Sequence, residues 1–211
     1  MDNEEHWADA RRIEAWAGEV RVNLIRLAAI VVFYGYHLIN IFLVPGNESL
    51  RGAYHATVTT LVMAWAAAVM LLHFCLSRRY VPPGLKYAST VWDIFLVTGL
   101  IAFTQDKPTS PLLTLYFVVI ASSALRLSLR LVYVATLGAI ASYLFLLGFY
   151  AFWVVGAEAY YGNESLRIPR SHEVIFVLAL GAAGICAGQA VRQARRLVEG
   201  YPVTVEDSPE K

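Results

Sequence analysis

Charged residues and cysteines are both scarce in this chain of 211 residues. Only 16% of the residues are charged and 58% are hydrophobic, a balance that does not fit an ordinary soluble domain. The 17 lysines and arginines nearly equal the 16 aspartates and glutamates, so no bulk basic field exists to bind nucleic acid. The two cysteines, Cys75 and Cys186, are too few for a disulfide scaffold and lack the spacing of a zinc or redox pair. This composition indicates a membrane protein whose functional charges are local.

The sequence also lacks the motifs of the common catalytic folds. It contains no P-loop, no glycine-rich dinucleotide fingerprint, no nucleophile elbow and no HExxH zinc motif. No predicted cytoplasmic loop is long enough to hold a catalytic domain. We therefore expect a protein that is not an enzyme and that holds no cofactor.

Six long apolar stretches are present, and each approaches or exceeds the roughly 20 residues that cross a bilayer as a helix. They cover residues 23–44, 55–77, 87–104, 111–129, 131–155 and 172–191. The fourth stretch contains Arg126, whose long side chain can reach the lipid headgroups from near a helix end. We predict an all-α fold, an integral membrane bundle of six transmembrane helices over residues 23–191.

The positive charges fall mainly on one side of this six-span arrangement. If the N-terminus is cytoplasmic, all but four of the 17 lysines and arginines lie on the cytoplasmic side. The four on the other side are Arg51, Lys107, Arg167 and Arg170. Because cytoplasmic loops of membrane proteins are enriched in lysine and arginine, we expect both termini in the cytoplasm.

The two ends of the chain differ from the membrane segments. Within residues 1–22, apolar side chains recur at helical spacing, which predicts a cytoplasmic amphipathic helix that lies on the membrane or contacts a partner. The apolar positions are Trp7, Ala10, Ile13, Trp16, Ala17 and Val20. Residues 192–211 begin with three arginines and continue with prolines and acids, so we predict a disordered cytoplasmic tail.

One hexapeptide occurs twice, since Gly-Asn-Glu-Ser-Leu-Arg stands at residues 46–51 and again at residues 162–167. Each copy is predicted to lie in an outer loop and is followed by a histidine, His55 or His172. The repeat is either coincidental helix-capping chemistry or a matched outer site that includes Glu48 and Glu164. A ring of six helices would place the second and sixth spans beside the first and bring the two copies together.

Ionisable groups inside the spans are the main functional candidates, because their burial in a membrane is costly. Asp93 is predicted about 10 Å inside the third span, counting 1.5 Å per residue from Lys86. We predict that it pairs with His73, Arg126 or Arg130, while Arg26 approaches the same side. Such a pair either fixes the helix register or acts as a protonation or conformational switch.

The outer side holds a second group of polar residues. These candidates for ligand binding are His37, His55, His172, Glu48, Asp106 and Glu164. No two of the histidines have metal-ligand spacing within one helix, so the sequence predicts no metal site. A haem- or metal-binding protein is a further alternative, which a visible spectrum would reveal.

The third and fourth spans resemble a known family. The residues concerned are Trp92 to Thr98 (WDIFLVT), Ser110-Pro111-Leu112 and Leu115-Tyr116-Phe117. They resemble the six-span membrane input regions of bacterial sensor histidine kinases and nucleotide cyclases. The resemblance implies a sensory or regulatory module of a bacterial inner membrane.

The resemblance also implies a partner, because such input regions continue into an output domain and this chain ends about 20 residues after Val191. We therefore expect a separate signalling protein on the cytoplasmic side, besides the lipid bilayer, and a homodimer is also consistent with the sequence. The alternative function is a small transporter or channel subunit. Transporter helices are often broken near mid-membrane, whereas the prolines here lie in loops or at span ends.

Overall fold

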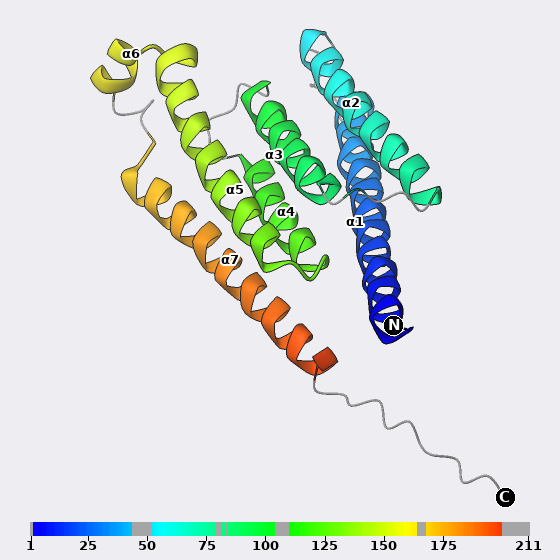
Figure 1. The fold of residues 1–211 in the computed structure, drawn as a ribbon. Helices are drawn as coiled ribbons and strands as arrows, with labels where there is room; N and C mark the ends of the chain where they lie inside the picture. Colours follow the sequence, from blue (N-terminus) through cyan, green and yellow to red (C-terminus); the bar gives the residue numbers. More distant parts are fainter. Residues whose placement is uncertain are drawn as a thin grey trace, which may run out of the picture.

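A computed structural model describes residues 2–43, 52–78, 82, 84–103, 110–163 and 168–199. Every regular element in these ranges is a helix, as Figure 1 shows. In chain order they are α1 (Asp2–Phe42), α2 (Ala53–Ser77), α3 (Leu85–Phe103), the 3-10 helix η2 (Pro111–Thr114), α4 (Leu115–Ala124), α5 (Leu129–Phe149), the π-helical η3 (Tyr150–Val154), α6 (Ala157–Gly162) and α7 (Arg170–Glu199). The prediction of an all-α fold is confirmed for these residues.

Five segments are long and apolar enough to cross a membrane, which is compatible with an integral membrane protein. They are Trp16–Phe42, Tyr54–Ser77, Leu85–Phe103, Leu129–Val154 and Arg170–Leu197. The predicted fourth span is a shorter apolar helix, Pro111–Ala124. It ends before Arg126 because the chain turns there, with Leu127 in a left-handed conformation at a φ of 49°.

The two predicted chain ends require correction. The predicted N-terminal helix and first span form one continuous helix, α1, of 41 residues. No proline interrupts α1, so nothing stops the helix at the predicted boundary of residue 22. Likewise α7 continues to Glu199, so residues 192–199 are helical, and only the remainder of the predicted tail lies outside the described residues.

The long helices form an open row and not a closed ring (Figure 1). The α1–α2 hairpin stands at one edge, α3 packs against α2 and α5, and α7 closes the other edge against α5 and α4. The second and sixth predicted spans therefore do not both lie beside the first. Instead α7 packs on α5 and α4, and the absence of a side chain at Gly184 allows it to approach Thr136 of α5 closely.

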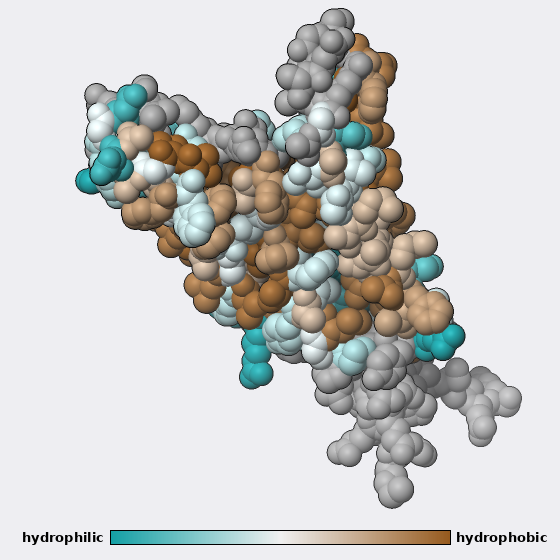
Figure 2. Space-filling view, turned by 90° about the horizontal axis from the view of Figure 1, so that it is seen from above, coloured by the Kyte–Doolittle hydropathy of each residue, from teal (hydrophilic) through white to brown (hydrophobic). Residues whose placement is uncertain are grey.

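The main core lies between α3, α4, α5 and α7. Its fully buried side chains include Val97, Tyr116, Ile120, Ala135, Ala139 and Leu180. By contrast, α1 and α2 leave most of their apolar side chains exposed, among them Val31, Val32, Met63 and Met70. Figure 2 shows hydrophobic residues over much of the visible face of the molecule, as contact with lipid chains requires.

Candidate functional site

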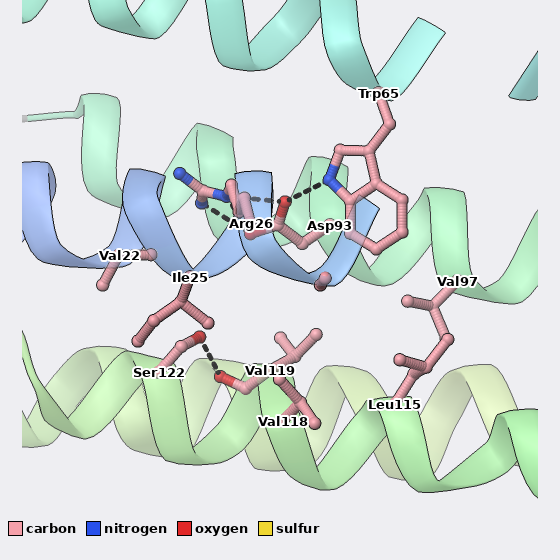
Figure 3. Close-up of a pocket in the computed structure, with 11 residues that line it drawn as sticks. Val22, Ile25, Arg26, Trp65, Asp93, Val97, Leu115, Val118, Val119 and Ser122 are labelled. Atoms are coloured by element: carbon pink, nitrogen blue, oxygen red, sulfur yellow. Dashed lines mark hydrogen bonds and ion pairs between the residues drawn. The ribbon is translucent and has the colours of Figure 1, made fainter. Parts of the chain in front are cut away.

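A buried ion pair joins α1 to α3. The guanidinium Nε of Arg26 donates to both carboxylate oxygens of Asp93 at 2.9 Å, and its Nη2 donates to Oδ2. Trp65 of α2 donates its indole Nε1–H to Asp93 Oδ1 at 3.3 Å, so three helices converge on one carboxylate (Figure 3). Both charged residues are only 5% exposed. Such bidentate geometry is among the strongest that an arginine and a carboxylate form.

A second buried ion pair joins α1 to the turn between α4 and α5. Arg126 Nη2 lies 3.0 Å from Glu19 Oε2. The same guanidinium also binds α3, because Nη1 donates to the Lys86 carbonyl at 2.9 Å and to Thr90 Oγ1 at 2.6 Å. Nη2 further donates to Ser89 Oγ at 3.1 Å. Arg126 therefore ties α1, α3 and the α4–α5 turn together.

The backbone of α1 approaches this turn closely at Gly18. A Cβ at Gly18 would stand 3.4 Å from the carbonyl oxygen of Leu125 and 3.5 Å from Arg126 Cα.

Burial lowers the pKa of the Arg126 guanidinium to about 10, and the neighbouring Glu19 carboxylate opposes that shift. Arg126 thus stays protonated at neutral pH.

Together Glu19, Arg26, Asp93 and Arg126 form what we call the charge quartet. Glu19 and Arg26 belong to α1, and they stand seven residues, or about two turns, apart on one face of that helix. Asp93 and Arg126 belong to the bundle that faces α1. Each side therefore contributes one positive and one negative group, so neither has a net charge within the quartet.

The quartet borders a small, mainly apolar cavity between α1 and α4. Its volume is about 20 Å³, which is enough for about one water molecule. Besides Arg26 and Asp93 its walls include Val22, Ala29, Val97, Leu115 and Val119. Among the described residues, Arg26 Nη1 and Arg126 Nε are buried without a hydrogen-bond partner. The two guanidiniums are therefore not fully satisfied in this arrangement.

The sequence-predicted inner residues are only partly brought together. Asp93 is buried, but its partner is Arg26 and not His73, Arg126 or Arg130. His73 is exposed and borders a cavity between α1 and α2, and Arg130 is exposed at the start of α5. The side chain of Arg126 is buried, but it pairs with Glu19, a residue that the sequence analysis missed.

One available signal for Glu19 was its spacing from Arg26. Opposite charges seven residues apart lie on one helix face and can meet a second pair of opposite charges. Two residues of the predicted apolar stripe, Ile13 and Val20, are exposed while Glu19 is buried, and Trp16 of the stripe donates to the Leu76 carbonyl of α2. The amphipathic pattern therefore does not identify the face that packs.

The outer candidates divide into two places. His37 of α1 and His55 of α2 meet, with His37 Nε2 and His55 Nδ1 3.2 Å apart. His172 lies near the start of α7, at the opposite edge of the row, beside Ser110, Thr114 and Tyr143. Glu48, Asp106 and Glu164 lie outside the described residues. The open row therefore keeps His55 and His172, the two histidines that follow the repeat, apart from each other.

Within the described ranges, no group of three or more histidine, cysteine, aspartate or glutamate side chains is placed to hold a metal ion. No family model matches the chain, and no curated protein or solved structure shows a significant similarity to it.

Proposed function

We propose that this protein is a sensory or regulatory module of a bacterial inner membrane, with α1 as the element that moves. In this proposal the chain crosses the membrane six times, with Pro111–Ala124 as a short crossing, and both termini are cytoplasmic. The observation that supports it is the charge quartet, because it joins α1 to the bundle through two buried ion pairs. Its output passes to a separate signalling protein.

The quartet offers two ways of pairing the same four charges. In the closed arrangement each pair spans α1 and the bundle. In an open arrangement Glu19 pairs with Arg26 on α1, and Arg126 pairs with Asp93 on the bundle. Arg126 already donates to Thr90, which stands one helical turn before Asp93 on α3. Opening therefore leaves no uncompensated charge on either surface.

The energetics of buried ion pairs suit such a switch. The Coulomb attraction of a buried pair is largely offset by the desolvation of its members, so the net stabilisation is small. The closed and open arrangements are therefore expected to differ by only a few kcal/mol, the range in which a ligand or signal shifts a two-state equilibrium. A continuous α1 transmits that shift along about 60 Å of helix.

The transporter alternative receives less support. The cavity beside the intramembrane charges, at about 20 Å³, is too small for a hydrated solute. The described prolines, Pro82, Pro111 and Pro169, stand outside the helices or at their first residue, so they break none of them. Discontinuous helices at mid-membrane are the usual sign of a transport site.

The proposed topology predicts the location of both termini. A reporter that is active only in the cytoplasm should give signal when it is fused after Lys211, because positive charges gather on the side of the termini. The same reporter inserted after Gly162, beyond α6, should be silent. The reverse pattern would contradict the topology.

The function itself predicts a partner contact that depends on the quartet. A photo-crosslinking residue at the exposed position Ile13 of α1 should capture a cytoplasmic protein in the native membrane. The yield of that adduct should change at least about threefold in Asp93→Asn, because α1 is then released, and not in the exposed control Arg130→Gln.

Mass spectrometry of the adduct identifies the partner, and immunoblotting gives its yield at equal expression. An adduct with the same partner and the same yield in all three proteins would contradict a signalling role for the quartet. Detectable flux of a solute through proteoliposomes of the purified protein would favour the transporter instead.

A further inference from the structure

The end of the α1–α2 hairpin far from the quartet contains a pair of histidines. His37 lies on the last two turns of α1, and His55 lies on the first turn of α2. Their nearest ring nitrogens, His37 Nε2 and His55 Nδ1, are 3.2 Å apart. Both side chains are half-buried, so the pair is partly shielded and still reachable from outside.

Aromatic rings surround the pair. Tyr34 stacks on His37 with ring centroids 6.0 Å apart, and Tyr54 lies 5.7 Å from the same ring. Phe42 meets His55 edge-on at 5.7 Å. The Tyr34 hydroxyl is in turn held by Thr59 Oγ1 at 3.2 Å. Packing of this kind limits how far each imidazole turns, so the two nitrogens stay close together.

We propose that His37 and His55 form a two-histidine site for a divalent transition-metal ion of the zinc and copper class. Imidazole nitrogens bind such ions at about 2.0–2.1 Å, and a tetrahedral angle then separates the two nitrogens by about 3.3–3.4 Å. The observed separation of 3.2 Å differs from this by only about 0.2 Å. Water molecules fill the remaining coordination positions, which leaves the ion exchangeable.

Metal binding requires only a change of tautomer. At 3.2 Å one ring donates its N–H to the lone pair of the other ring, and the two ring planes differ by 19°. For the ion to bind, the proton on the donating nitrogen moves to the far nitrogen of the same imidazole. Both facing nitrogens then present a lone pair, a small in-plane rotation directs these at the ion, and no net proton is released.

The site links α1 to α2. The proposal depends on the geometry of this hairpin and does not require the quartet to have a signalling role. Imidazole is a suitable ligand for zinc, copper and nickel, whereas magnesium and calcium prefer oxygen ligands. The ion class therefore follows from the donor atoms.

The test uses the full chain without a histidine tag in lipid nanodiscs. A background variant has asparagine at His6, His73 and His172 and alanine at Cys75 and Cys186. His37 and His55 are then the two histidines that remain in the chain. One equivalent of Cu²⁺ should give an electron paramagnetic resonance spectrum with the coupling of two imidazole nitrogens. His37→Asn or His55→Asn in this background should abolish the two-nitrogen pattern, because each leaves at most one imidazole ligand.

Zn²⁺ provides a second readout that does not depend on copper. It should raise the melting temperature of the background variant, because an ion that binds only the folded state stabilises it. The rise should be absent in His37→Asn and in His55→Asn, each of which must show the helical circular dichroism of its parent. A copper spectrum without the coupling of two imidazole nitrogens in the background variant, or an equal Zn²⁺ effect after either substitution, would overturn the proposal.

Discussion

Replacing Asp93 with alanine should lower the free energy of unfolding by about 3–5 kcal/mol, because it leaves Arg26 buried without its counter-ion. The loss should also remove the acceptor for the Trp65 indole N–H. Unfolding in mixed micelles, followed by circular dichroism and Trp fluorescence, measures the change.

Two further variants separate loss of charge balance from loss of packing. The double variant Arg26→Met with Asp93→Leu should recover most of the stability, since apolar residues of similar volume often replace a buried ion pair without loss. Arg130→Gln removes an exposed charge and should change the stability by less than about 0.5 kcal/mol. If Asp93→Ala melts like the unaltered protein, the carboxylate is not in a buried pair.

Replacing Gly184 with alanine should destabilise the bundle by about 1–3 kcal/mol, because α5 and α7 must move apart. A Cβ at Gly184 would stand 2.6 Å from Thr136 Cγ2 and 2.9 Å from Thr136 Cβ, which are not the end of a flexible chain. Gly181→Ala is the matched control one turn earlier on α7. Its Cβ meets nothing within 4 Å, so the added helix propensity should leave the stability unchanged or slightly higher.

A compensating substitution tests the cause of that loss. Thr136→Ala removes the Oγ1 and Cγ2 atoms that the new methyl group would meet and keeps only Cβ, 2.9 Å from it. The lost hydroxyl donates to the Val132 carbonyl of its own helix. Gly184→Ala should therefore cost less stability when Thr136→Ala accompanies it, with a smaller loss left from the contact with the Cβ at position 136. Equal losses with and without Thr136→Ala would show that the contact between α5 and α7 is not the reason.

The helical fold was predictable because apolar length is read directly from sequence. The main error in the spans was local, since the apolar pattern runs on past Ala124 while the helix does not. The chain turns at Arg126 because this residue binds Glu19 of α1 and polar groups of α3. Those partners are distant in sequence, so no local pattern predicts the turn at Arg126.

The burial of Asp93 in an ion pair was also predictable, but its partner was not. Counting residues along a helix gives the height of a side chain and leaves open the neighbour that it faces. His73, Arg126 and Arg130 were the expected partners and Arg26 was expected only on the same side, and the packing of α1 against the bundle selects Arg26. The same limit applies to His37, His55 and His172, because the open row brings only the first two together.

The most direct measurement of the central claim is the distance between the ends of α1 and α7. Spin labels at Ile13 and Leu197, both exposed, report it by double electron–electron resonance in nanodiscs, with Cys75 and Cys186 replaced by alanine. The closed quartet predicts one narrow distance distribution. Asp93→Asn should add a second, longer distance, because Arg26 leaves its uncompensated position in the bundle.

The double variant Arg26→Met with Asp93→Leu should return to the single narrow distribution, since Glu19 and Arg126 still pair and no buried charge is left without a partner. This pattern of a closed native protein, an opened single variant and a reclosed double variant is the result that we expect. One unchanged distribution in all three proteins would contradict the account, because it would show that the quartet does not hold α1 in place.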